Sequence, residues 1–175
     1  MKNILDYLER TTVCNAWKTA VDDGNICMTW LELQEMSKSI GTALCKRTGR
    51  QKPVVILAEK SAVTLAAMFG VVYAGCFYVL MDTKQPASRL QQILGILDSA
   101  VIVTSEKYLK DLEKLEFKGK VLMAPDLAAE QENEAVLNEI REQALDVDPL
   151  YGIFTSGSTG VPKAVSYTHL RAHET

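Results

Sequence analysis

The chain has 175 residues, 47% of them hydrophobic and 23% charged, which is ordinary for one soluble globular domain with a real core. Its net charge of -3 excludes the basic surface typical of nucleic-acid binding, and no apolar run approaches the roughly 20 residues that span a bilayer. The start, MKNILDYLERTT, is interrupted by charges where a secretory signal needs an apolar stretch, which favours a cytoplasmic location.

The first clearly signalled helix begins in TWLELQEMSKSIGTALCKR. Thr29 and Glu32 form a capping-box pattern, in which each side chain satisfies a backbone N–H of the first turn. Apolar residues then recur at helical spacing, namely Leu33, Met36, Ile40 and Leu44.

Strand-like and helical segments alternate from there to residue 156. The expected strands are PVVILAE, CFYVLMD, AVIVTS, KVLMA and YGIFTS. Ser61 is expected to cap a helix from Ala62 to about Tyr73, and Pro86 is expected in the first turn of a further helix. Thr104 or Ser105 is expected to cap a short charged helix. The Glu-rich residues 126–144 are expected to form a solvated helix or a loose connection. The pattern predicts an α/β fold with a mostly parallel sheet flanked by helices.

In such sheets, ligands bind outside the carboxyl ends of the strands, and the stretch TSGSTGVPK leaves one of these ends. Its hydroxyl groups, its conformationally free glycines and its lysine suit a polyphosphate, which needs many donors and charge neutralisation. The candidate phosphate-binding residues are Thr155, Ser156, Gly157, Ser158, Thr159, Gly160 and Lys163. The loop matches neither the Walker A pattern nor G-x-G-x-x-G, and by composition alone it could be a Ser/Gly-rich linker.

The motif YGIFTSGSTGVPK resembles the phosphate-binding signature of the adenylate-forming (AMP-binding) enzymes. Upstream and in the family's order, MTWLELQEMSKSIGTAL resembles the first conserved helix, and VVYAGCFYVLMDTKQPASRLQQIL resembles the second motif. Leu80 and Met81 depart from that second motif, where the family commonly has proline and an aliphatic residue. The run containing Tyr78, Asp82, Pro86 and Arg89 is closer to members that activate amino acids, including D-alanine–carrier-protein ligases and peptide-synthetase adenylation domains.

The resemblance implies a two-step reaction that uses ATP and Mg²⁺. A carboxylate, here an amino acid, attacks the α-phosphorus of ATP to give acyl-AMP and pyrophosphate, and a carrier-protein phosphopantetheine thiol then takes the acyl group. The loop residues would hold the β- and γ-phosphates. The family's magnesium-binding glutamate and catalytic lysine lie downstream of this loop, so residues 1–163 are expected to be an incomplete, inactive N-terminal portion. Acyl-CoA synthesis and a stand-alone nucleotide-binding or regulatory module are the alternatives.

The last segment, VSYTHLRAHET, contains both histidines, His169 and His173. They could share a helix face as metal ligands, or Val165, Thr168 and His169 could match a family pattern that follows the loop. A third interpretation is favoured, because all eleven residues 165–175 match one reading frame of a common transposon-based sequencing adapter. Ala164 fits a codon shared between the enzyme and that adapter. Residues 164–175 are therefore expected to be an adapter-derived artefact, and no metal site is expected.

The four cysteines are Cys14, Cys27, Cys45 and Cys76. No two of them have the spacing of a CxxC metal knuckle or redox pair. They are therefore expected to be free thiols in a reducing compartment.

Overall fold

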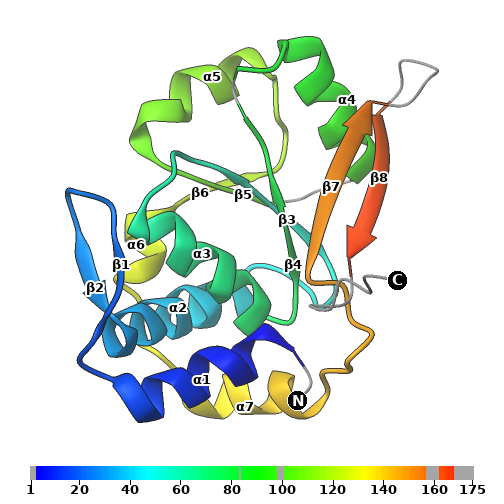
Figure 1. Cartoon of the computed structure of the whole chain (residues 1–175). Helices are drawn as coiled ribbons and strands as arrows, with labels where there is room; N and C mark the ends of the chain where they lie inside the picture. Colours follow the sequence, from blue (N-terminus) through cyan, green and yellow to red (C-terminus); the bar gives the residue numbers. More distant parts are fainter. Residues whose placement is uncertain (1–2, 83, 98–100, 157–161, 168–175) are drawn as a thin grey trace, which may run out of the picture.

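The computed structural model describes residues 3–82, 84–97, 101–156 and 162–167, with side chains described as far as residue 154 (Figure 1). The helices are α1 (Ile4–Asn15), α2 (Trp30–Cys45), α3 (Ala62–Tyr73), α4 (Ala87–Leu97), the 3-10 helix η1 (Glu106–Tyr108), α5 (Leu109–Lys114), α6 (Ala124–Ala128) and α7 (Glu134–Glu142). The strands are β1 (Thr19–Asp22), β2 (Cys27–Thr29), β3 (Pro53–Leu57), β4 (Phe77–Leu80), β5 (Val101–Thr104), β6 (Lys120–Met123), β7 (Tyr151–Ser156) and β8 (Pro162–Tyr167).

Within the described residues, six strands form the main sheet in the order β6-β5-β3-β4-β7-β8. The strands from β6 to β7 are parallel, whereas β8 is antiparallel to β7. This arrangement confirms the predicted α/β fold and all five predicted strands. The small β1–β2 hairpin and the strand β8 were not predicted.

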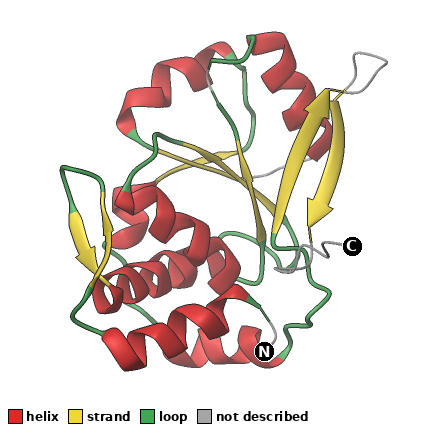
Figure 2. Ribbon diagram, viewed as in Figure 1, coloured by secondary structure: helices red, strands yellow, loops and turns green. Residues whose placement is uncertain are grey.

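Helices cover both faces of the sheet, with α4 and α5 on one face and α1, α2, α3, α6 and α7 on the other (Figures 1 and 2). The alternation of side chains along β3 explains how one strand serves both layers. Val54 and Ile56 belong to the core shared with α1–α3, while Val55 and Leu57 belong to the core shared with α4 and α5. The strand is apolar throughout because both of its faces are buried.

The starts of α2 and α3 confirm the caps predicted at Thr29 and Ser61. The Thr29 hydroxyl accepts from the Glu32 amide and the Glu32 carboxylate accepts from the Thr29 amide, which completes the capping box of α2. Ser61 accepts from the Thr64 amide and caps α3. The sequence did not reveal that Asp23, in the β1–β2 turn, accepts from the Ala62 amide at 2.8 Å. This bond, with further backbone donors, lowers the pKa of Asp23.

The helices α2 and α3 pack unusually closely where two glycines replace side chains. A Cβ atom added at Gly70 would lie 2.6 Å from Ile40 Cγ2 and 3.0 Å from the Ser37 carbonyl oxygen. A Cβ atom added at Gly41 would lie 2.6 Å from Tyr73 Cβ. The contact between these helices therefore depends on glycine at both positions.

The segment 126–144 is more ordered than a loose connection. It forms parts of two helices, α6 and α7, which bury Leu127 and Leu137 in the core. Ion pairs also attach it to α2, where Lys38 contacts Glu134 at 2.7 Å and Lys46 contacts Glu130 at 2.6 Å. The sequence prediction underestimated this packing because only a few apolar residues interrupt the charged run.

The four cysteines are free thiols, as predicted. Cys14 and Cys27 are exposed, whereas Cys76 is buried. Burial raises the pKa of Cys45 to about 11 and also raises the pKa of Cys76. Since the thiolate is the reactive form of cysteine, Cys45 and Cys76 are poor nucleophiles near neutral pH.

Candidate functional site at the carboxyl edge of the sheet

The predicted phosphate-binding stretch starts in β7 and ends in β8. Backbone pairing places Lys163 opposite Thr155 and Pro162 opposite Ser156. The structure therefore brings the backbones of Thr155, Ser156 and Lys163 together at the carboxyl end of β7 (Figure 1). The intervening part of the prediction, Gly157, Ser158, Thr159 and Gly160, lies outside the described residues. The ends of the loop thus leave the sheet at the edge where parallel α/β sheets bind ligands.

A cavity of about 280 Å³ opens between β4 and β7 below this edge. The two strands pair at Tyr78 with Tyr151 and at Val79 with Gly152, and no further register pair is formed. The Tyr78 and Tyr151 rings stack with centroids 5.8 Å apart, and burial raises the pKa of Tyr78. Beyond the paired residues, the cavity is lined by Met68, Leu80, Met81, Gln85, Ile93, Ile153 and Phe154. The two strands are therefore paired at the amino end of β7, and the cavity lies where they separate beyond Gly152.

The turn after β4 places the polar residues of the second family-like motif beside this cavity. Asp82 accepts from the Lys84 amide at 2.9 Å, and Gln85, which lines the cavity, accepts from Arg89 Nε at 3.1 Å. Pro86 accepts from the Arg89 and Leu90 amides and so starts α4. The exposed Leu80, one of the two departures from the family pattern, also lines the cavity.

The carboxyl ends of β3 and β5 are tied together by side chains for which the sequence predicted another role. Thr104 donates its hydroxyl to the Leu57 carbonyl at 2.6 Å, and Ser105 donates to Glu59 Oε2 at 2.8 Å. Neither side chain caps the helix that follows, so that prediction was wrong. Thr104 and Ser105 bond to residues at the end of β3 instead, because the ends of parallel strands lie side by side at this edge. Glu59 was missed, although its position directly after a buried strand was an available signal.

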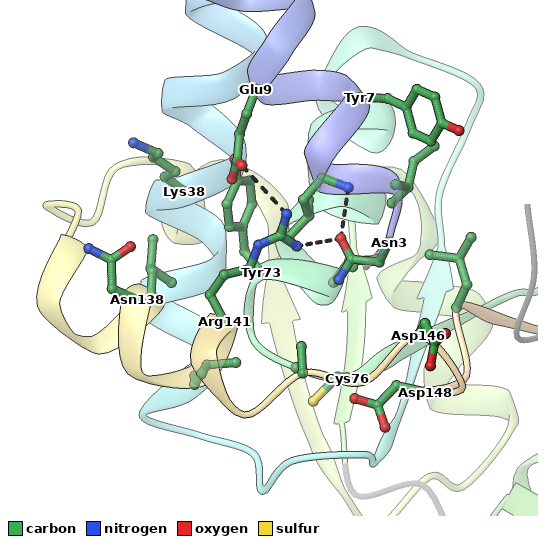
Figure 3. A pocket seen from close by; sticks show the side chains of 18 of the residues that line it. Asn3, Tyr7, Glu9, Lys38, Tyr73, Cys76, Asn138, Arg141, Asp146 and Asp148 are labelled. Atoms are coloured by element: carbon green, nitrogen blue, oxygen red, sulfur yellow. Dashed lines mark hydrogen bonds and ion pairs between the residues drawn. The ribbon is translucent and has the colours of Figure 1, made fainter. Parts of the chain in front are cut away.

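A larger cavity, of about 740 Å³, lies at the opposite edge of the sheet (Figure 3). Its lining includes Gln51, Cys76 and Leu150, which precede β3, β4 and β7. Since ligands of parallel sheets bind at the carboxyl edge, cavity size alone points to the wrong end of the molecule.

A cluster of charged and polar groups in this larger cavity is internally paired. Arg141 of α7 donates to Asn3 and Asp6 and lies 3.5 Å from Glu9 Oε2 (Figure 3). The Tyr73 hydroxyl donates to Glu9 at 3.2 Å, and burial together with the Glu9 carboxylate raises the pKa of Tyr73. These contacts join α1, α3 and α7, so the cluster accounts for helix packing without a ligand.

Two absences concern the described part of the chain only. It contains no group of three or more His, Cys, Asp and Glu side chains placed to hold a metal ion. Nor does it contain a helix long and apolar enough to cross a membrane. The candidate ligands His169 and His173 lie outside the described residues.

Sequence comparisons identify curated relatives of the chain. The chain is 30% identical over 173 residues to the nonribosomal peptide synthetase imqB of Aspergillus flavus, covering 95% of this chain and 5% of that protein. It is 30% identical over 166 residues to the D-alanine–D-alanyl carrier protein ligase of Staphylococcus aureus, covering 94% of this chain and 32% of that protein. The chain thus spans a third or less of the length of these curated relatives.

Solved structures share the fold. The anthranilate CoA ligase AuaEII, in complex with anthranoyl-AMP, superposes with a TM-score of 0.78 at 22% identity, covering 94% of this chain and 33% of that one. VinN superposes with a TM-score of 0.75 at 20% identity, covering 92% of this chain and 44% of that one. Residues 8–175 match the sequence profile of the family described as AMP-binding enzyme. The chain therefore belongs to the AMP-binding (adenylate-forming) enzyme family.

Proposed function

We propose that residues 1–163 are the N-terminal portion of a ligase that activates an amino acid as aminoacyl-AMP and transfers it to a phosphopantetheinyl carrier protein. The observation that carries this proposal is the TSGSTGVPK stretch, whose ends leave β7 and enter β8 at the carboxyl edge of the parallel sheet. The relatives support an amino acid and a carrier, because they include a peptide synthetase and a ligase named for D-alanine and its carrier protein. Free cysteines suit a cytoplasmic enzyme.

In this proposal the chain's own residues bind the phosphates of ATP. Thr155, Ser156, Ser158 and Thr159 supply hydroxyl donors, Gly157 and Gly160 supply backbone N–H groups, and Lys163 supplies positive charge. Mg²⁺ would neutralise the phosphates further, through residues of the longer enzyme. Holding the phosphates in line and stabilising their charge are the main ways in which such an active site accelerates adenylation.

ATP–pyrophosphate exchange with a panel of amino acids and fatty acids tests the proposal. We expect exchange with an amino acid by the longer enzyme and none by the present chain. Lys163→Ala should lower the exchange rate of the longer enzyme on the order of 100-fold, the loss typical of removing a charge-stabilising group. Lys114→Ala is the control, because this exposed lysine pairs only locally with Asp111 on α5. Exchange by the present chain, or exchange supported only by fatty acids, would contradict the proposal.

We also propose that residues 164–175 are translated adapter and not enzyme. The support is the match of residues 165–175 to one reading frame of the adapter. Pairing of β8 with β7 does not distinguish adapter from native sequence, because ladder hydrogen bonds join backbone groups whatever the side chains are. Long-read sequencing of the source locus should show different codons after Lys163. A native gene that encodes VSYTHLRAHET and then stops would refute this interpretation.

A further inference from the structure

The strand that leads into the phosphate loop is held weakly by its parallel neighbour. β7 extends from Tyr151 to Ser156, yet its register with β4 contains only the pairs Tyr78–Tyr151 and Val79–Gly152. Few ladder hydrogen bonds therefore fix β7 against β4. β7 pairs along its whole length with β8, but this hairpin is attached to β4 through those two pairs, so contacts outside the ladder help to place it.

One such contact is made by Gln51, in the turn before β3. Its backbone N–H donates to the Gly75 carbonyl at 2.7 Å, just before β4. Its side-chain Nε2 donates to Asp148 Oδ1 at 2.7 Å, just before β7. Gln51 thus connects the amino ends of three adjacent strands, β3, β4 and β7. To do so it adopts a φ of 55°, which L-residues other than glycine, asparagine and aspartate seldom do.

Arg50 makes a second connection between the amino ends of β3, β4 and β7. Its Nη1 donates to Gln143 Oε1 at 2.7 Å, its Nη2 donates to the Gln143 carbonyl at 2.9 Å, and Nη2 lies 3.9 Å from Asp148 Oδ2. Its stem covers Gly75, since a Cβ atom added there would lie 3.5 Å from Arg50 Cγ and Nε. Arg50 therefore reaches from the start of β3 across the start of β4 to the segment that enters β7.

We propose that Arg50 and Gln51 are positioning residues that fix the amino end of β7 and, through this strand, the phosphate loop at its carboxyl end. Asp148 completes this amino-edge clamp, because it also accepts from the Leu145 amide at 2.9 Å and so shapes the entry to β7 (Figure 3). The clamp lies at the edge of the sheet remote from the candidate site. Its link to phosphate binding rests on the proposed function, whereas its effect on β7 does not.

The role of the clamp is local, so its test must be local too. The Arg50 side chain is 34% exposed and its ion pair is long, so this pair contributes little to global stability. The Arg50 Nε atom is buried and has no hydrogen-bond partner among the described residues, so removing it also relieves an unfavourable burial. Melting temperature would mix these two effects, whereas amide exchange reports β7 separately from β3 and β5.

Hydrogen–deuterium exchange of the present chain and its variants tests the clamp. Arg50→Met keeps the apolar stem and removes the guanidinium, while Gln51→Gly removes the bond to Asp148 and leaves a residue that accepts a positive φ. In each variant we expect the amides of residues 151–154 to exchange about tenfold faster, with β3 and β5 changing by less than about twofold. Should Arg50→Met fail to fold, Gln51→Gly still decides the question, because its backbone is unstrained.

Glu116→Gly is the matched control. Glu116 is the other described non-glycine residue with a positive φ, 49°. It follows α5, on the face of the sheet that α4 and α5 cover (Figure 1). This control should leave exchange in β7 unchanged. Unaltered β7 exchange in both clamp variants, or equal acceleration in β3, β5 and β7, would overturn the proposal.

The link to the phosphate loop has its own measurement. In the longer enzyme, Gln51→Gly should raise the dissociation constant for ATP about threefold or more, the range expected for a structural coupling between distant sites. Faster β7 exchange with unchanged ATP affinity would overturn the link. Absence of ATP binding by the unsubstituted longer enzyme would instead overturn the proposed function. The hydrogen–deuterium exchange result for β7 would still stand.

Discussion

Alanine in place of Gly70 is expected to destabilise the chain by about 1–3 kcal/mol, even though it adds a single methyl group. The new Cβ would lie 2.6 Å from Ile40 Cγ2, 2.7 Å from Ile40 Cβ and 3.0 Å from the Ser37 carbonyl oxygen. These atoms belong to the opposing helix α2 and its fully buried side chain, so neither can move without displacing its neighbours. Urea unfolding followed by circular dichroism would measure the loss.

Gly95→Ala is the matched control for this experiment. Gly95 is also inside a helix, α4, but a Cβ atom added there would meet nothing within 4 Å. Alanine should therefore stabilise the chain by about 0.5–1 kcal/mol, the usual gain from replacing a helical glycine. Equal effects at the two positions would show that α2 and α3 do not pack as closely as described.

Truncation of Ile56 to alanine should cost about 2–5 kcal/mol, the range for large-to-small changes in a closed core. Ile56 lies on the central strand β3, only 1% exposed, between Leu80 of β4 and Val103 of β5. Because strands and helices enclose it, the cavity left behind cannot collapse completely. The measurement is the free energy of unfolding from denaturant titration.

Val121→Ala is the comparison on the edge strand β6, where the valine is 38% exposed. Water already reaches this side chain, so its truncation should cost clearly less than that of Ile56. Ile56→Val should fall between the two, at about 0.5–1.5 kcal/mol. A loss at Ile56 no larger than that at Val121 would mean that β3 is not the centre of the sheet.

Much of the fold could be predicted because local signals and burial agree. The strand PVVIL is apolar throughout since both faces of β3 are covered, and the caps at Thr29 and Ser61 lie where the hydrophobic pattern starts. The predicted bounds of α3 and β7 match the structure. Where local pattern and packing point the same way, a single sequence is sufficient.

The predictions that failed or were not made depend on partners distant in sequence. Ser105 has the pattern of a cap, but Glu59 on the neighbouring strand end takes its hydroxyl instead. The clamp at Gln51 depends on Asp148, 97 residues away, and on a backbone conformation that glutamine seldom adopts. No periodicity or local motif can reveal such contacts.

In the candidate site too, local features could be predicted and contacts between distant residues could not. The position of the loop after a strand could be predicted and is confirmed by β7, whereas its role in phosphate binding stays a prediction. The cavity between β4 and β7 could not be predicted, because it exists only where two strands distant in sequence diverge. For the same reason, the structure and not the sequence shows that Gln85 lines this cavity.

The strand order has a consequence for synthesis on the ribosome. The strands β3, β4, β5 and β6 occupy residues 53–123 and are neighbours in the sheet, so they can assemble while the remainder is still being made. β4 then presents an unpaired edge until β7 emerges, and such an edge can capture a foreign strand. The stretch TSGSTGVPK ends β7 and follows it, so it is made after these four strands, and the β4 edge stays unpaired during that interval.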